Sequence, residues 1–351
     1  MQAPFSVYFV NNDYYILNHF LKENKFSKIF IIVDENTNEY CLPYFLPKLE
    51  TELSLEIIEL EAGEENKTIE TCVNIWEALT ELGADRKSLI INIGGGVITD
   101  MGGFIASTFK RGLSFINIPT TLLSMVDASI GGKNGIDLGG LKNQIGTITQ
   151  PNMVLIDSYY LQSLSQRELR SGLAEMLKHG LIANKNHWNR FKDLSSINFQ
   201  DFDSIIKESV TIKAQIVEQD PREIGIRKTL NFGHTLGHAI ETFFLEHSNK
   251  ERLLHGEAIA CGMILESFLS FKKKLLSADE YLEIKNLICG IYDSISFDSD
   301  EINFIINLLI HDKKNEFGKV QFSLLNSIGQ CVINQTVEHS EILAAFNDYK
   351  N

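Results

Sequence analysis

The first 160 residues alternate between short apolar runs and segments of helical spacing, and this alternation restricts the fold more than any other feature of the chain. Apolar runs rich in β-branched residues occupy positions 28–33, 55–60, 88–93, 115–118 and 153–156. Such runs predict buried strands. Helical spacing is evident at 40–49 and 68–82. Strands that alternate with helices favour a mainly parallel sheet covered by helices.

The second half of the chain has a different pattern. Helical spacing recurs at 167–182, 202–219, 229–244, 256–273 and 278–290, and the clearest late strand is 320–325. A chain of 351 residues is long enough for about two domains of roughly 150 residues each. We therefore predict a Rossmann-like α/β domain over 1–160 and a mostly α-helical domain over 161–351, with the boundary near 157–165.

Composition and charge exclude several classes of protein. No apolar run is long enough to cross a bilayer, and the N-terminus lacks the pattern of a secretory signal. The five cysteines are scattered without a CxxC pair, which is typical of reduced thiols in a cytoplasmic protein. The formal net charge of −14 disfavours nucleic acid as a partner.

A glycine-rich turn follows the third predicted strand, in the stretch LIINIGGGVITD at 89–100. Glycines let the backbone approach a ligand closely, and a helix N-terminus offers free N–H groups to phosphate. The stretch is not GxGxxG, so the first-strand dinucleotide fingerprint is absent. Asp34, at the end of the first strand, could bind ribose hydroxyls. The alternative is an ordinary tight turn between strand and helix.

The polar residues that say most about a bound ligand lie in a basic, glycine-rich stretch at 110–146. Its cations Lys110, Arg111, Lys133 and Lys142 lie among glycines and apolar residues rather than on an amphipathic helix. Cations beside glycines are typical of a backbone brought close to a bound anion. Ordinary loop lysines are the alternative. The threonines at 120 and 121 could cap a helix or bind a cofactor.

The stretch NFGHTLGHAIE at 231–241 places His234 and His238 one helical turn apart, on one face. Further candidate ligands are His255, in HGEA, and Glu175, in an apolar helix where a buried carboxylate needs a partner. Carboxylate and imidazole ligands suit Zn²⁺. Spacing alone leaves open both whether a metal binds and which helical histidine would hold it.

Together these segments resemble the 3-dehydroquinate synthase family. The resemblance extends from about Val33 to Lys314 and rests on GGGVITD, KRG, IPTTLLSMVDASIGGKNGID, LKNQIG, SGLAEMLKHGL, LNFGHTLGHAIE and HGEA. It implies an NAD-binding α/β domain, a helical domain, zinc (or cobalt) between them, and commonly a homodimer. The implied reaction converts the sugar phosphate 3-deoxy-D-arabino-heptulosonate 7-phosphate to 3-dehydroquinate and phosphate in the shikimate pathway, with NAD recycled in each turnover.

The resemblance also implies roles for residues. The metal ligands are expected to be Glu175, His234 and His255. The catalytic residues are expected to be Lys133, Asn143, Lys178 and His238. The cofactor contacts are expected to be Asp34, Gly63, Glu64, Lys67, Gly95, Gly96, Val97, Asp100, Thr120, Thr121, Lys133 and Lys142. The substrate contacts are expected to be Arg111 (from a neighbouring subunit), Asp127, Lys133, Lys142, Asn143, Lys178, Lys213, Arg227, Asn231, His238 and one of Lys313 and Lys314.

Three alternatives remain beside this interpretation. The segment between His238 and His255 is a few residues longer than is usual in the family, so His247 is an alternative to His255 as a ligand. Another sugar-phosphate cyclase, forming 2-deoxy-scyllo-inosose or a valiolone, would share the scaffold. A metal-dependent alcohol or glycerol dehydrogenase would share the architecture, but it would not need the cations at 110–146.

Overall fold

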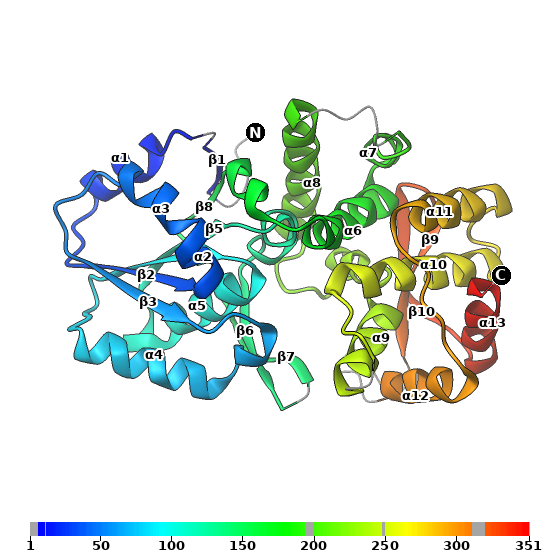
Figure 1. The fold of residues 1–351 in the computed structure, drawn as a ribbon. Coiled ribbons are helices and arrows are strands. Elements are labelled where there is room, and N and C mark those ends of the chain that lie inside the picture. The colour runs from blue at the N-terminus through cyan, green and yellow to red at the C-terminus, as the bar shows by residue number, and fades with distance from the viewer. Residues whose placement is uncertain are drawn as a thin grey trace. The chain divides into compact units, whose positions relative to one another are not determined.

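The computed structural model describes residues 6–10, 12–139, 141–193, 199–247, 250–310 and 320–350. Lys313 and Lys314 lie outside these residues. The chain divides into two compact units, Met1–Ser165 and Gln166–Asn351 (Figure 1). The cofactor-binding and metal-binding roles expected of 1–160 and 161–351 stay predictions.

A six-stranded sheet forms the centre of the first unit. Its strands are β1 (Val7–Phe9), β2 (Ile29–Asp34), β3 (Leu55–Leu60), β4 (Leu89–Gly94), β5 (Ser114–Pro119) and β8 (Met153–Ile156). The strand order is β1-β8-β5-β4-β2-β3, and all pairs are parallel. The predicted α/β class with a mainly parallel sheet is therefore confirmed. The three-residue strand β1 was not predicted, because so short a run carries little periodicity.

Helices cover both faces of this sheet. On one face α4 (Ile69–Glu81) and α5 (Gly96–Thr108) pack their apolar residues against the side chains of Phe30, Ile32 and Ile90. Neighbouring side chains along a strand point to opposite faces, so Ile29 and Ile31 belong to the other face. Figure 1 shows α1 (Tyr15–Glu23) and α3 (Leu42–Phe45) on that side. Burial on both faces explains why the central strands are apolar throughout.

The single helix predicted at 40–49 is wrong in its extent. The structure has α2 (Glu35–Tyr40), then α3, then a 3₁₀ turn at Leu46–Lys48. Asp34 starts α2 early, since its carboxylate accepts a hydrogen bond from the amide of Thr37 at 2.8 Å in a capping box. Pro43 and Pro47 each stand at the start of a new helical segment, where a missing N–H is tolerated.

The basic, glycine-rich stretch forms an antiparallel hairpin of β6 (Lys133–Leu138) and β7 (Leu141–Ile148). The hairpin packs on α5. Gly103 of α5 has no side chain, and this leaves room for Asn134. A Cβ atom at Gly103 would lie 2.0 Å from the Asn134 side-chain oxygen. This hairpin was not predicted, because its glycines and charges interrupt the alternation that marks a strand.

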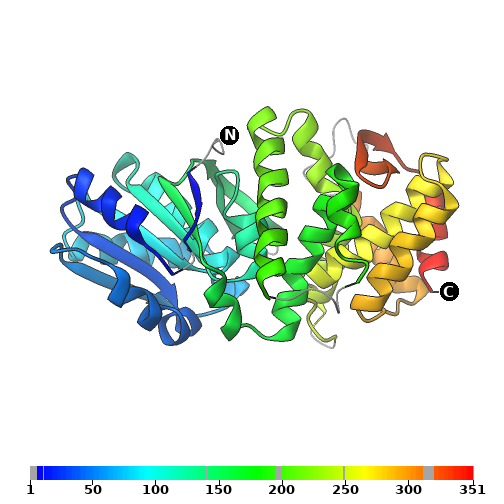
Figure 2. The same cartoon turned by 90° about the horizontal axis from the view of Figure 1, so that it is seen from above.

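The second unit is mostly helical, as predicted. Its helices are α6 (Gln166–Ala183), α7 (Lys185–Asn189), α8 (Phe199–Gln219), α9 (His234–Glu246), α10 (His255–Lys272), α11 (Ala278–Ile291), α12 (Ser299–Ile310) and α13 (His339–Tyr349). Helix α10 is central: it contacts α6, α9, α11 and α13, and it is buried on all sides from Ala258 to Ser270. The long helix α8 lies beside α6 (Figure 2). An antiparallel pair, β9 (Gln321–Ser327) and β10 (Gln330–Thr336), completes the unit, and β10 was not predicted.

The helix predicted at 229–244 is broken in two. A 3₁₀ segment runs over Ile226–Asn231, and α9 begins only at His234. Gly233 between them has φ 78°, a left-handed conformation that ends one helix and that glycine adopts without strain. This break places His234 in the first turn of α9.

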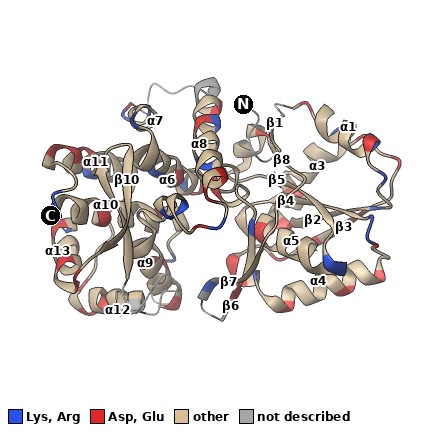
Figure 3. Ribbon diagram, turned by 180° about the vertical axis from the view of Figure 1, so that it is seen from behind, with Lys and Arg blue, Asp and Glu red and all other residues tan. Residues whose placement is uncertain are grey.

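The net charge of the chain is acidic, and Figure 3 shows acidic residues along α4 and α13. Among the helices that the structure describes, none combines the length and apolar character needed to cross a bilayer.

Candidate active site

A buried carboxylate in the second unit collects two histidines and a lysine. Glu175, on α6, is 0% exposed. Its Oε1 atom lies 3.3 Å from Nε2 of His234 and 3.6 Å from Nε2 of His255, and its other oxygen forms an ion pair with Lys178. Within the described residues, neither oxygen has a hydrogen bond of regular geometry. Two imidazole nitrogens therefore converge on one buried carboxylate oxygen.

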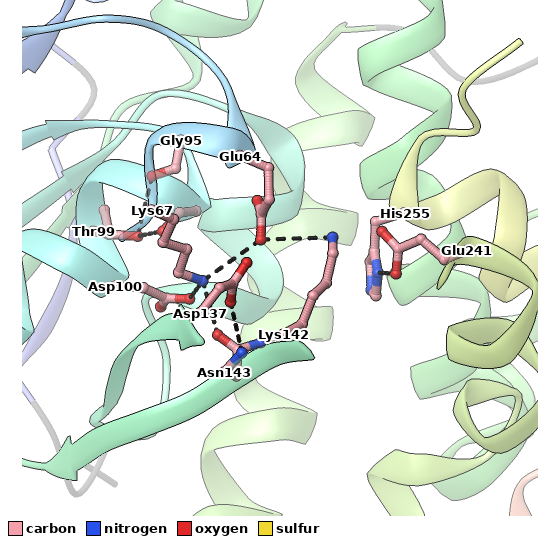
Figure 4. A network of polar contacts seen from close by, with 11 residues as sticks. Glu64, Lys67, Gly95, Thr99, Asp100, Asp137, Lys142, Asn143, Glu241 and His255 are labelled. Carbon is pink, nitrogen blue, oxygen red and sulfur yellow. Dashed lines mark hydrogen bonds and ion pairs between the residues drawn. The ribbon is translucent and has the colours of Figure 1, made fainter. Parts of the chain in front are cut away.

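The second nitrogen of each histidine has its own partner. Nδ1 of His234 lies 3.2 Å from the carbonyl oxygen of Phe232, and Nδ1 of His255 lies 3.3 Å from Oε2 of Glu241 (Figure 4). When Nδ1 donates its proton to an oxygen, Nε2 is left with a lone pair for a metal ion. Both rings are therefore held with Nε2 toward Glu175.

His238 also belongs to this cluster. Its ring centroid lies 5.0 Å from that of His234 and 5.7 Å from that of His255. The three rings offer nitrogens within 4.8 Å of one another, so the geometry allows more than one set of three ligands. His247 lies elsewhere, with its ring against Phe243 and Phe304.

Burial and neighbouring charge shift the titration of these groups. Burial lowers the pKa of His234 to about 4, and the nearby Lys178 acts in the same direction. Burial also disfavours the charged form of His255, but Glu241 and Glu175 outweigh it and raise the pKa of His255 to about 10. Burial opposes ionisation of Glu175, yet Lys178 and His234 hold its pKa well below the ordinary value.

This donor set fits a divalent metal ion. One carboxylate and two neutral imidazoles, each with an outer hydrogen-bond partner, are ligands that Zn²⁺ accepts with a position left open. Because a ligating imidazole must be neutral, occupancy would displace the proton of His255. The residues present thus fit the ion that the family resemblance implied.

Further cations of the second unit are buried. Lys178, Lys213 and Arg227 are all less than 9% exposed. The Arg227 guanidinium donates to the carbonyl oxygen of Pro221 at 2.8 Å, and Asn231 Nδ2 donates to Glu223 Oε1 at 2.6 Å. Buried positive charge of this kind suits the recognition of an anionic molecule.

In the first unit, the glycine-rich turn lies where strand order reverses. Strand β3 lies on one side of β2. The next strands in the chain, β4 and β5, lie on the other side of β2. Ligands of parallel α/β sheets bind outside the carboxyl ends of the strands at such a point. Asp34 ends β2 and Gly95 follows β4, so both stand at this position. Asp34 already caps α2, which uses part of its capacity to accept hydrogen bonds.

The turn itself leaves little space for a side chain. Gly95 is the N-cap of α5, and Gly96 is the first helical residue, followed by Val97. A Cβ atom on Gly95 would lie 3.0 Å from the methyl group of Thr121, and the amide of Thr120 donates to the Gly94 oxygen at 3.0 Å. Gly95 has no side chain to cap α5, and a helix N-terminus of this kind suits an anion.

A polar network near this turn joins several predicted cofactor residues (Figure 4). Nζ of Lys67 donates to Oδ2 of Asp100 at 2.8 Å and to Oδ1 of Asn143 at 2.8 Å. Glu64, which follows Gly63, lies 3.9 Å from Lys67 and 3.5 Å from Lys142. Burial lowers the pKa of Lys67, but Asp100 and Glu64 outweigh it and the net shift is upward. The structure therefore brings together the residues at 64, 67, 100, 142 and 143.

Other predicted residues of the first unit lie on other elements. Arg111, with φ 73°, ends an exposed 3₁₀ turn at Phe109–Arg111. Asp127 lies in a π-helical turn at Ser124–Ala128, and Lys133 is exposed at the start of β6. One functional residue was missed: Glu241 ends the quoted histidine stretch, seven residues after His234. Its position two turns along the same helix face was the signal.

Comparisons with known proteins agree on one family. Residues 57–171 match the family described as 3-dehydroquinate synthase N-terminal, and residues 172–315 match 3-dehydroquinate synthase C-terminal. A 3-dehydroquinate synthase from Parabacteroides distasonis is 42% identical over 336 residues, which cover 95% of this chain and 94% of that protein.

Solved structures of related cyclases have the same fold. The 2-epi-5-epi-valiolone synthase from Streptomyces hygroscopicus, with NAD⁺ and Zn²⁺ bound, superposes with a TM-score of 0.84 at 25% identity, covering 100% of this chain and 98% of that one. A 2-deoxy-scyllo-inosose synthase, complexed with carbaglucose-6-phosphate, NAD⁺ and Co²⁺, gives a TM-score of 0.84 at 26% identity, covering 98% and 96%. The family matches and the identity to the Parabacteroides protein show that this chain belongs to the 3-dehydroquinate synthase family.

Proposed function

We propose that this chain converts 3-deoxy-D-arabino-heptulosonate 7-phosphate to 3-dehydroquinate and inorganic phosphate, as a lyase with NAD recycled in each turnover. The observation that carries the proposal is the convergence of His234 and His255 on the buried carboxylate of Glu175, in a chain that is 42% identical to a 3-dehydroquinate synthase. The identity to that relative also supports this reaction over those of other sugar-phosphate cyclases or of alcohol dehydrogenases.

Glu175, His234 and His255 are the ligands of a divalent ion, Zn²⁺ or Co²⁺, in this proposal. When bound, such an ion stabilises negative charge on substrate oxygens. His238 lies beside the ligands and binds a substrate oxygen or the phosphate. Lys178, held against Glu175, donates to a substrate hydroxyl.

The remaining residues of the second unit hold the anionic ends of the substrate. Lys213, Arg227 and Asn231 bind carboxylate or hydroxyl oxygens, with one of Lys313 and Lys314 as a further contact. Arg227 suits this task because its backbone amide donates to Asp220 Oδ2 at 3.0 Å, which holds the residue in place. Positioning a flexible sugar in one conformation limits wrong reactions.

In the first unit, NAD is held at the carboxyl ends of β2 and β4. The N-terminus of α5 and the closely packed Gly95 and Gly96 face the pyrophosphate, and Asp34 binds a ribose. Further contacts are assigned to Gly63, Glu64, Lys67, Val97, Asp100, Thr120, Thr121, Lys133 and Lys142. The residues assigned to the substrate are Arg111, Asp127, Lys133, Lys142 and Asn143. Its phosphate is held by Lys133, Asn143 and, from the neighbouring subunit, Arg111. We further propose that the protein is a cytoplasmic homodimer.

The test is a product assay with the purified full-length chain. With the heptulosonate 7-phosphate, NAD⁺ and Zn²⁺, we expect equal amounts of phosphate and 3-dehydroquinate, and no accumulation of NADH. Net NADH formation would contradict the proposal, and so would phosphate release from glucose 6-phosphate in preference to the heptulosonate.

A further inference from the structure

The first turn of α9 lacks a cap of its own, although the helix begins with a proposed metal ligand. His234 is the first helical residue, and the N-cap is Gly233, which has no side chain. The first amides of a helix have no partner within the helix, so in a buried position they need an acceptor from elsewhere.

Glu266 of α10 supplies that acceptor. Its Oε2 atom accepts from the amide of Gly233 at 2.7 Å, and its Oε1 atom accepts from the amide of Leu236 at 3.1 Å. Glu266 is 0% exposed. The carboxylate takes the place of an N-cap side chain, and its negative charge is favourable at the positive end of the helix. Both amides flank His234 in the sequence.

Glu266 also connects the helices that carry the two histidine ligands. His255 is the first residue of α10, and Glu266 lies eleven residues later, about three turns along the same face. A carboxylate fixed on α10 therefore sets where α9 begins relative to α10. The separation between His234 and His255 depends on where α9 begins relative to α10.

The two helices are in backbone contact at this point. A Cβ atom on Gly262 would lie 2.0 Å from the oxygen of Gly233, and one on Gly237 would lie 3.2 Å from the Cα of Ile259. Such close packing leaves no space for α9 to shift toward α10. The hydrogen bonds to Glu266 oppose a shift in the opposite direction, because moving away would leave two buried amides unsatisfied.

We propose that Glu266 is a positioning residue of the metal centre, which holds His234 at the distance from His255 that the ion requires. It acts through the backbone of Gly233 and Leu236 and does not itself bind the metal. This inference rests on the proposed function, since it takes Glu175, His234 and His255 as the ligands.

The test uses Glu266→Gln and Glu266→Ala in the full-length chain. The glutamine has the same shape but only one oxygen to accept, and the alanine has none. After metal removal, Zn²⁺ affinity is measured by competition with a chromophoric chelator, and the Co²⁺-loaded proteins are compared by visible absorption. We expect affinity to fall about tenfold in Glu266→Gln and on the order of 100-fold in Glu266→Ala, with an altered cobalt spectrum in both.

Ser270→Ala is the matched control. Ser270 is buried one turn further along α10. Its hydroxyl donates to the backbone oxygen of Glu266 at 2.7 Å and accepts from the amide of Leu325 at 3.0 Å, so its removal leaves the Glu266 carboxylate and its bonds to α9 in place. This variant should lower thermal stability and leave Zn²⁺ affinity and the cobalt spectrum unchanged. Unchanged affinity in Glu266→Gln, together with a loss of stability like that of Ser270→Ala, would overturn the inference even if Glu266→Ala failed to fold. If the wild-type chain failed to bind Zn²⁺, the proposed metal centre itself would be wrong, and this inference with it.

Discussion

Nδ1 of His255 lies 3.3 Å from Oε2 of Glu241, which stands on the neighbouring helix α9 and is buried. The contact turns the ring so that its other nitrogen faces Glu175. Two helices thus determine the direction of one proposed metal ligand. The Glu241 contact can be removed by substitution without changing the proposed ligands.

Glu241→Ala should weaken Zn²⁺ binding by about 10–100-fold, because an outer partner of a ligating histidine orients the ring and raises its basicity. Chelator competition on the metal-free protein measures the change. Glu341→Ala is a control: Glu341 is in the first turn of α13 and pairs with Lys273 at 3.1 Å. Equal losses of affinity in the two variants would mean that the Glu241 contact has no special role.

Gly262→Ala should destabilise the second unit by about 1–3 kcal/mol, because a methyl group there meets the backbone oxygen of Gly233. Gly290→Ala provides the comparison. Gly290 is an exposed residue of α11, and a Cβ atom there meets nothing within 4 Å, so stability should rise by about 0.4–1 kcal/mol. Thermal or urea unfolding measures both. Similar effects of the two substitutions would contradict the close packing of α9 on α10.

Lys67→Met should destabilise the first unit by about 3 kcal/mol, because Asp100 would lose the cation that its largely buried carboxylate contacts. The double variant Lys67→Met/Asp100→Asn should recover part of the loss, since a neutral amide needs no counter-ion. Urea unfolding of both proteins provides the measurement. A double variant no more stable than Lys67→Met alone would show that the Lys67–Asp100 pair is not the source of the effect.

Because of His187, the free energy of unfolding should fall in mild acid. Burial lowers the pKa of His187 below its ordinary value of 6.5, although Glu208 acts in the opposite direction. As pH falls below about 6.5, the unfolded chain binds a proton at this position that the folded chain does not yet bind, so unfolding becomes more favourable. One such group contributes at most about 1.4 kcal/mol per pH unit.

The comparison with His187→Gln isolates that contribution. The free energy of unfolding of this variant should fall less steeply between pH 7 and 5 than that of the wild-type chain. Identical slopes would mean that His187 titrates alike in the folded and unfolded protein.

Local patterns in the sequence were sufficient for five of the six strands of the central sheet, all except β1, and for the placement of His234 and His238 on one helix face. The strand at 28–33 and the run that ends in Gly94-Gly95-Gly96 carry their own periodicity and their own stop signals. His234 and His238 are linked by helical spacing alone. These features depend on residues within one or two turns of each other, so no knowledge of tertiary contacts is needed.

Features that depend on tertiary pairing were not predicted. Glu241 and Glu266 are ordinary helical residues in the sequence, and their roles arise only when α9 packs on α10. The hairpin at 133–148 was hidden because Asn134 and Ile136 are buried through contact with α5 and not through regular alternation. The break before His234 depends on the left-handed conformation of Gly233, which the helical pattern on both sides concealed.

The central claim is that Glu175, His234 and His255 hold the divalent ion, and Zn²⁺ binding by Glu175→Gln tests it most directly. The wild-type chain should bind one Zn²⁺ per chain in equilibrium titration. Glu175→Gln should lose more affinity than the roughly 10–100-fold expected for an outer partner, because a ligand itself is neutralised. Stoichiometric binding by Glu175→Gln with wild-type affinity would contradict the account.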